Sequence, residues 1–425
     1  MVLNGVGGKD MSKNMVADHA IRPVENDTIF TISAKASEAV KKYGPDKVIN
    51  SSMGVLLEDN GDFVAFKSVY DYLESLDAPK IAAYASIEGD KDFLKAVKKA
   101  CFKDNMPNAY IEAVATPGGS GAIHHSVFNY TNIGDTVITS SLYWDPYNTI
   151  CLESGRKLDT YNMFNEKGGL DIDAFKEKFN YYLTKQKRLL TIFNTPAHNP
   201  TGYSVSDEEW DEILVVLKEA AKDKDNKIIV LVDVAYIDFC DEQFNRRKFM
   251  EKFEGLDENI LILIAFSASK GYTMYGLRNG ALLCVTSKEE IAKEFFYTNL
   301  HSNRGTWSNG TKGAMRVLTD IINDENLGNN FIKEREHYVK MLRRRADVFL
   351  QKSEEVGLKL YPYKDGFFVC IPCKDPVKAA DLLMEENVFV IPLQTGLRFA
   401  LCAVGEEKCA LAPKIIKEVL NKWDE

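Results

Sequence analysis

The chain has 425 residues, of which 45% are hydrophobic, so it is long enough for two or three domains with a sizeable core. Its formal net charge of -9 argues against a nucleic-acid partner, because binding a phosphate backbone needs a basic face. We expect a cytoplasmic protein without a membrane partner, because we find no signal-peptide core and no apolar run near the roughly 18 residues of a membrane span.

The cysteines and histidines do not indicate a metal site. Eight cysteines stand without a repeating spacing, so we expect reduced thiols that pack in the interior. Cys370 and Cys373 form a CxxC pair in an apolar stretch, but the later cysteines do not complete a zinc pattern. His124 and His125 are adjacent, and on a helix they point in different directions, so we expect them to be structural.

Short apolar runs alternate with stretches of helical spacing, which is typical of an α/β fold. The predicted strands, in chain order, are residues 136–141, 188–194, 227–234, 259–266 and 280–285. Between two of them, residues 206–225 form a predicted helix, with a capping box at Ser206 and Glu209 and an apolar stripe that begins at Trp210. The near-continuous apolar runs favour a central parallel sheet with helices on both faces.

Polar segments lie beside four of these runs. "TPGGSGAIHHSVFNY" precedes the first, and "TPAHNPTG", "VAYIDF" and "SASKG" follow the next three. Ligands of such sheets bind beyond the carboxyl ends of the strands. We therefore expect the four segments to lie along one edge of the sheet and to form one site.

The glycine-rich segment suits a phosphate. Gly119, Ser120 and Gly121 stand at the start of a predicted helix, where backbone N–H groups and the positive helix end favour an anion. A third glycine at dinucleotide spacing is absent, since residue 124 is histidine, which argues against NAD. The hydroxyls of Ser267 and Ser269 in "SASKG" and the two-donor cation Arg278, which follows that segment, could bind the same phosphate.

Lys270 stands between a buried strand and a glycine, where an amine loses hydration and gives up its proton near neutral pH. A lone lysine there is more often a solvated loop residue, but Asp233 ends the neighbouring strand as a carboxylate suited to a cationic ring nitrogen. Tyr236 adds a hydroxyl. A cofactor with an aldehyde, a phosphate and a pyridine nitrogen accounts for all of these groups together.

The constellation resembles the class I, fold-type I pyridoxal phosphate (PLP) aminotransferases, within them the aspartate/aromatic amino acid group. "AHNPTG", "DVAY", "SASKGYTMYGLR" and "RGTWSN" carry the resemblance, which covers most of the chain. It implies a large PLP-binding domain over residues 63–308, with a mostly parallel seven-stranded sheet sandwiched by helices. It also implies a smaller α/β domain over 20–62 and 309–425, an N-terminal arm over 1–19, and a homodimer with shared active sites.

The resemblance assigns the cofactor contacts. Lys270 carries PLP covalently and moves the proton between the substrate Cα and the cofactor, and Asp233 keeps the ring nitrogen protonated. Asn199 and Tyr236 hydrogen-bond the phenolic oxygen, and Trp144 stacks on the ring. The phosphate contacts are Gly119, Ser120, Ser267, Ser269, Arg278 and the partner subunit's Tyr84. Gly118 stands where relatives often carry serine.

The resemblance also assigns the substrate contacts. Arg398 matches the arginine that binds the α-carboxylate, and Asn199 and Trp144 complete that end of the site. Arg304 matches the arginine that, in aspartate aminotransferases, reaches from the partner subunit to the distal carboxylate; the alternative is an interface salt bridge. We expect ping-pong transamination with 2-oxoglutarate. Aspartate is the first choice of amino donor, and an aromatic amino acid the second, because Gly305 and Trp307 differ from the residues common in aspartate-specific relatives.

Two other functions are compatible with the same residues. A PLP-dependent C–S β-lyase uses the same lysine and aspartate, because the fate of the carbanion depends on which substrate bond stands perpendicular to the ring. A non-catalytic PLP-binding regulator would normally carry a basic DNA-binding segment. We find no such segment in the sequence, so this alternative is the least favoured.

Overall fold

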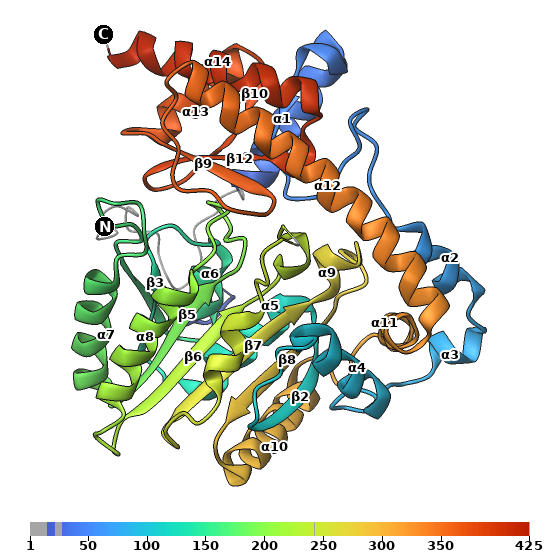
Figure 1. Cartoon of the computed structure of the whole chain (residues 1–425), viewed down its shortest axis with the longest axis vertical. Helices are drawn as coiled ribbons and strands as arrows, with labels where there is room; N and C mark the ends of the chain where they lie inside the picture. The colour runs from blue at the N-terminus through green and yellow to red at the C-terminus, as the bar shows by residue number, and fades with distance from the viewer. Residues whose placement is uncertain (1–14, 22–27, 242, 425) are drawn as a thin grey trace.

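The computed structural model describes residues 15–21, 28–241 and 243–424 (Figure 1). Residues 1–14 of the predicted N-terminal arm therefore lie outside the described residues. None of the helices described here combines the length and the apolar character that crossing a membrane requires.

The larger sheet has seven strands in the order β2-β8-β7-β6-β5-β3-β4. Their bounds are β2 (Tyr110–Pro117), β3 (Thr136–Ser140), β4 (Lys157–Tyr161), β5 (Arg188–Asn194), β6 (Lys227–Asp233), β7 (Ile260–Ser267) and β8 (Asn279–Thr286). Strand β8 runs antiparallel to both of its neighbours, and the other pairs are parallel. The predicted α/β fold with a mostly parallel seven-stranded sheet is confirmed.

Helices cover both faces of this sheet, which is why its central strands are buried along their whole length. Alternate residues of β7 enter two separate apolar clusters: Ile262 lies in one and Leu263 in the other. The helices on one face are α5 (Gly118–Tyr130), α6 (Pro146–Glu153) and α10 (Glu289–Thr306). Those on the other face include α4 (Lys91–Phe102), α7 (Ile172–Gln186) and α8 (Asp207–Ala220). The predicted capping box at the start of α8 is present, with both Ser206 and Glu209 engaged.

The register of the strands brings several chain segments to one edge of the sheet. Asn194 of β5 pairs with Asp233 of β6, so these two strands end side by side. Because β8 is antiparallel, it starts at the edge where β2 and β7 end, with Asn279 beside Pro117 and Gly280 beside Ser267. The residues that follow β2, β5, β6 and β7 therefore meet at this edge.

A second group of elements lies over that edge (Figure 1). It contains an antiparallel sheet in the order β11-β12-β9 and a parallel pair β1-β10. The strands are β1 (Ile49–Asn50), β9 (Phe368–Pro372), β10 (Val388–Phe389), β11 (Ile391–Pro392) and β12 (Gly396–Ala400). Its helices are α1 (Thr28–Tyr43), α13 (Pro376–Glu385) and α14 (Glu406–Asp424).

The long helix α12 (Glu325–Glu355) connects the two groups: it packs on α14 at one end and on α2 and α11 at the other (Figure 1). The remaining helices beside it are α2 (Lys67–Ser75), α3 (Ala78–Ala82) and α11 (Lys312–Asn323). Glu334 of α12 accepts hydrogen bonds from the backbone N–H groups of Lys67 and Ser68, which start α2. The predicted domain limits at residues 62/63 and 308/309 stay predictions.

The one-turn helix α9 (Ala268–Gly271) and five short 3-10 helices complete the described elements. The 3-10 helices are Asp18–Ala20, Pro45–Lys47, η4 (Ile237–Phe239), η5 (Lys248–Phe253) and Leu401–Ala403. The cysteines are free thiols, and all except Cys373 are buried.

Candidate active site

A cavity of about 270 Å³ opens at the edge where β5, β6 and β7 end. All four polar segments expected at this edge contribute to the cavity. The residues of the predicted cofactor site that line it are Gly119, Ser120, Trp144, Asn199, Asp233, Tyr236, Ser267, Ser269, Lys270 and Arg278. Ile123, Asn194, Ala235 and Tyr275 complete the lining.

One end of the cavity is a polar cradle at the start of α5. Gly119 lies against Ser267, whose Cβ would be 3.4 Å from a Cβ at residue 119. Gly118 has a φ of +68°, and a Cβ there would stand 2.8 Å from a guanidinium nitrogen of Arg278. Arg278 also donates to Ser269 Oγ at 3.4 Å. A serine at residue 118 would therefore be strained and would displace the arginine, which is a physical reason for glycine here.

Lys270 lies on the short helix α9 (Ala268–Gly271) that follows β7. Its Nζ donates a hydrogen bond to the backbone oxygen of Gly54 at 2.9 Å and lies 4.6 Å from the ring centre of Tyr275. Burial lowers the pKa of Lys270 to about 8, and the positive charge of Arg398 acts in the same direction. A fraction of this amine is therefore neutral near neutral pH, as a nucleophile or proton acceptor requires.

Asp233 ends β6 and is 5% exposed. Its Oδ2 accepts a hydrogen bond from the Tyr147 hydroxyl at 2.6 Å, and its Oδ1 accepts one from the backbone N–H of Ala235 at 3.1 Å. Burial raises the pKa of Asp233, although both hydrogen bonds and the charge of Lys270 oppose the increase. Among the described residues, Asp233 has no ion pair with an arginine, so this carboxylate can still accept a cationic partner.

Asn199 and Tyr236 lie together on the wall of the cavity. The Asn199 amide donates to the Tyr236 hydroxyl at 3.5 Å, and its backbone N–H donates to Asn194 Oδ1 at 2.6 Å. Burial raises the pKa of Tyr236 above its usual value, so the phenol stays protonated and can donate. Trp144 stands edge-on to Tyr147, with ring centres 5.5 Å apart and planes at 87°.

Arg398 lines an adjoining cavity of about 550 Å³, which shares Trp144 and Asn199 with the first one. The Arg398 side chain donates to the backbone oxygen of Ser52 at 2.8 Å, and its guanidinium lies 4.7 Å from the ring centre of Phe368. Arg398 is 5% exposed, so its positive charge stands close to the cavity and away from bulk water.

Two predicted residues do not reach the cavity of their own subunit. Tyr84 is 88% exposed. Arg304 lies exposed on the last turn of α10 and donates to Ser308 Oγ at 2.7 Å. Close to Arg304, the Trp307 ring stacks on His125 with ring centres 4.3 Å apart.

Sequence reasoning missed several residues of this site. Tyr147, Tyr275 and Asn194 were not singled out, although the first contacts Asp233 and the other two line the cavity. A signal existed for Asn194, which is the last residue of a predicted strand. Gly54 comes from a distant segment and gave no local signal.

The fold and the cavity define a class of protein in which a lysine, a carboxylate and a polar cradle at a helix start meet at the carboxyl edge of a mostly parallel sheet. Residues 46–415 match the sequence profile of the family described as "Aminotransferase class I and II". The chain belongs to this family.

Curated relatives include the cytoplasmic aspartate aminotransferase of Dictyostelium discoideum, 26% identical over 305 residues, which are 70% of this chain and 67% of that protein. The aromatic-amino-acid aminotransferase of Paracoccus denitrificans is 24% identical over 290 residues, which are 64% of this chain and 68% of that protein. These names divide between two kinds of substrate.

Among solved structures, an aminotransferase from Anaerococcus prevotii is 41% identical, with a TM-score of 0.94 over 96% of this chain and 100% of that one. An aromatic-amino-acid aminotransferase from Burkholderia pseudomallei, described as covalently bound to pyridoxal phosphate, is 18% identical, with a TM-score of 0.77 over 94% of this chain and 98% of that one. The chain is thus an aminotransferase with the fold-type I architecture, and its cofactor is PLP.

Proposed function

We propose that this enzyme transfers the amino group between an L-amino acid and 2-oxoglutarate by a ping-pong mechanism, with aspartate as the first choice of donor and an aromatic amino acid as the second. The observation that carries the proposal is the convergence of Lys270, Asp233 and the cradle around Gly119 on one cavity. Each of the three is suited to a different part of the same cofactor.

The donors of the cavity fit PLP. The backbone N–H groups at Gly119 and Ser120 and the side chains of Ser267, Ser269 and Arg278 would hold its phosphate. Asp233 would hold the ring nitrogen in its protonated form, because a buried carboxylate without a cation favours a positive partner. When bound, PLP supplies an electron-withdrawing ring that stabilises the negative charge developing on the substrate Cα. Asn199 and Tyr236 would donate to the phenolic oxygen, and Trp144 would cover the ring.

Lys270 would hold the cofactor covalently and then carry protons. Once the substrate amine has replaced Lys270 on the cofactor, the neutral Nζ would accept the proton from the substrate Cα and deliver it to the cofactor carbon C4′. A pKa of about 8 supports this role, because both protonation states are populated near neutral pH. The second group of elements lies over the cavity and would exclude water during these steps.

Arg398 would bind the α-carboxylate of the substrate, for which a planar two-donor guanidinium is suited. We further propose a homodimer in which Tyr84 and Arg304 act in the cavity of the partner subunit. Both residues are exposed and neither lines the cavity of its own chain, which supports this arrangement. Arg304 would then meet the distal carboxylate of a dicarboxylic substrate.

One assay separates transamination from the β-lyase alternative. The enzyme is given an amino acid alone and then an amino acid with 2-oxoglutarate. A transaminase forms a second amino acid only in the second reaction, whereas a lyase releases pyruvate and ammonia in the first. The non-catalytic alternative is set aside, because the chain belongs to a family of transferases.

Arg304→Ala tests the substrate. Losing one partner of a buried charge pair costs a few kcal/mol, so kcat/KM for aspartate should fall by roughly a hundredfold or more, with a much smaller change for phenylalanine. Arg344→Ala is the matched control, because Arg344 is an exposed arginine paired with Glu406. Equal losses for both substrates would remove Arg304 from this role. A wild-type enzyme active only on neutral aliphatic amino acids would exclude the dicarboxylate proposal.

A hybrid dimer tests the shared site. One subunit carries Lys270→Ala and the other carries Arg304→Ala. If Arg304 acts across the dimer, one of the two sites in the hybrid keeps both residues, and aspartate activity returns to about half of the wild-type level. If Arg304 acts within its own subunit, both sites of the hybrid lack one of these residues, and aspartate activity stays low.

A further inference from the structure

Tyr147 contacts the buried carboxylate of the site. Its hydroxyl donates to Asp233 Oδ2 at 2.6 Å, and the residues are 0% and 5% exposed. Within the part of the chain that the structure describes, no other side chain donates to this carboxylate, whose second oxygen accepts the backbone N–H of Ala235. Neither the sequence motifs nor the resemblance assigned a role to Tyr147.

Packing fixes the direction of this hydroxyl. Tyr147 lies on the first turn of α6, and its ring belongs to the apolar cluster on the α5 and α10 face of the sheet. Trp144 stands edge-on against the ring. The phenol ring is therefore held on its apolar faces, and its one polar atom points at the end of β6.

Among the described residues, no cationic side chain forms an ion pair with Asp233, although the charge of Lys270 acts on it from a distance. The titratable groups that face Asp233 and Tyr147 are Lys270 and Tyr236. Burial and the charge of Asp233 raise the pKa of Tyr147 well above its usual value, so this phenol stays a neutral donor throughout the working pH range. A neutral donor stabilises the carboxylate and leaves its negative charge in place, whereas an arginine would neutralise that charge.

We propose that Tyr147 is a positioning residue, whose hydrogen bond holds the Asp233 carboxylate charged and aimed at the ring nitrogen of the cofactor. This inference rests on the proposed role of Asp233. Without the hydroxyl, Asp233 becomes more basic and draws the shared proton from the ring nitrogen toward its own oxygen. The ring then carries less positive charge, which makes the Lys270 nitrogen bound to the cofactor more basic.

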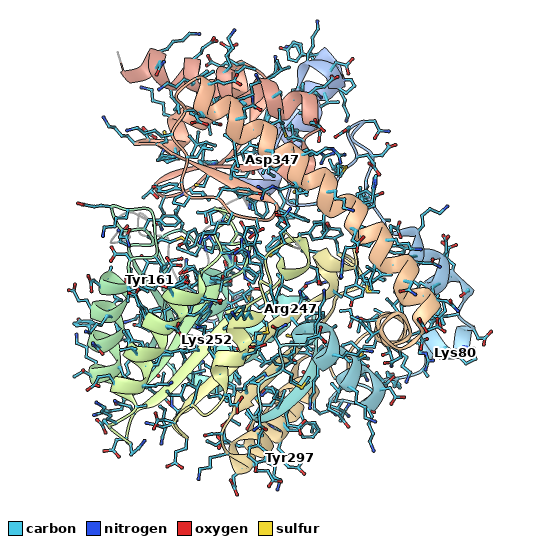
Figure 2. All side chains as sticks on the ribbon, in the orientation of Figure 1. Lys80, Tyr161, Arg247, Lys252, Tyr297 and Asp347 are labelled. Carbon is cyan, nitrogen blue, oxygen red and sulfur yellow. The ribbon has the colours of Figure 1, made fainter. Side chains whose placement is uncertain are left out.

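The test is Tyr147→Phe in the cofactor-loaded enzyme. We expect the pH midpoint of the visible absorbance change to move upward, because the Lys270 nitrogen holds its proton more tightly. We expect kcat to fall about tenfold or more, the usual size for a hydrogen bond to a charged group, while KM for the amino donor changes much less. Tyr161→Phe is the matched control: Tyr161 is 3% exposed and lies on β4 beside α7 (Figure 2), outside the lining of the cavity.

Two further variants separate the possible outcomes. Asp233→Asn should move the same midpoint further than Tyr147→Phe. If Asp233→Asn moves it and Tyr147→Phe does not, the role of Tyr147 is wrong and that of Asp233 stands. If neither moves it, the assignment of Asp233 itself fails.

A third variant avoids any problem of folding. Tyr147→3-fluorotyrosine keeps the ring in place and makes the hydroxyl a stronger donor, so the midpoint should move downward, opposite to Tyr147→Phe. An unchanged midpoint, or a shift in the same direction as Tyr147→Phe, would show that ring packing rather than the hydrogen bond matters.

Discussion

Asp233, at the end of β6, and Asp238, in the following 3-10 helix η4, both have buried carboxylates. The groups that surround the two carboxylates differ in charge. Asp233 accepts hydrogen bonds from a phenol and a backbone N–H, and burial raises its pKa. Asp238, in η4, forms ion pairs through its Oδ1 with the guanidinium groups of Arg247 at 2.7 Å and Arg335 at 3.2 Å. Burial alone would raise the pKa of Asp238, but the two arginines outweigh it and lower the value to about 2.

The Asp238 cluster adjoins the short helix α9, which carries Lys270 of the proposed active site. Asp238 packs against the residue that follows Lys270, since a Cβ at Gly271 would stand only 2.4 Å from Asp238 Oδ2. Arg247 of this cluster sits in the interior of the molecule (Figure 2). A buried carboxylate whose counterions come from the protein is a structural element, because it links chain segments and needs no ligand. A buried carboxylate without such counterions can accept a cationic ligand, and this difference separates the supporting cluster from the proposed site.

The largest effect should come from Lys270→Ala. Loss of the amine should reduce transamination by about a thousandfold or more, because the covalent anchor and the proton carrier disappear together. Some cofactor should still bind noncovalently through the phosphate cradle. Borohydride reduction of the wild-type enzyme followed by peptide mapping should label Lys270. Label on another lysine would overturn the assignment, and Lys288→Ala, at an exposed pair with Glu258, is the control.

Asp233→Ala should cause the second largest loss of activity. Turnover should fall by about a hundredfold or more, because the ring nitrogen loses the charge that keeps it protonated. Cofactor retention, measured by equilibrium dialysis, should change less than turnover, since the phosphate contacts remain. Turnover equal to that of the wild type would contradict the proposed contrast between Asp233 and Asp238.

Asp238→Asn should affect stability rather than chemistry. Removing the carboxylate leaves Arg247 and Arg335 buried without their counterion, which typically costs about 3–5 kcal/mol of unfolding free energy. Asp347 of α12 (Figure 2) provides the control variant, Asp347→Asn. Its pair with Arg343 is exposed, and such pairs contribute about 0–1 kcal/mol. Denaturant unfolding gives both values. If Asp238→Asn lost no more stability than Asp347→Asn, the cluster would not be structural.

The sequence was sufficient to place those residues of the two clusters that lie next to a recognisable strand. Asp233 is the last residue of one buried strand and Lys270 follows the end of another, so the apolar runs indicated their places at the sheet edge. Strand β2 was not predicted, because only its residues 113–116 are fully buried and its apolar run is short. Tyr147 of α6 contacts the end of β6, and Arg335 of α12 contacts η4. Both contacts depend on tertiary packing, which no local sequence pattern encodes.

The smallest effect concerns a buried histidine without a countercharge. His125 bonds Asn303 Oδ1 at 3.0 Å, and burial lowers its pKa to about 4 from the usual 6.5. The unfolded chain therefore binds a proton at a pH where folded His125 stays neutral. Between pH 6.5 and about 4, this histidine should lower the unfolding free energy by roughly 1.4 kcal/mol per unit of falling pH.

Denaturant unfolding of His125→Gln across this pH range tests that slope. The variant keeps a polar side chain beside Asn303 but removes the titrating ring, so its stability should fall less steeply than that of the wild type as the pH decreases. His198 has a pKa lowered by burial to about 3, and its contribution should remain in the variant. Parallel slopes for the two proteins would mean that His125 takes up its proton in the folded state, and that burial at this position does not act as it does at Asp233.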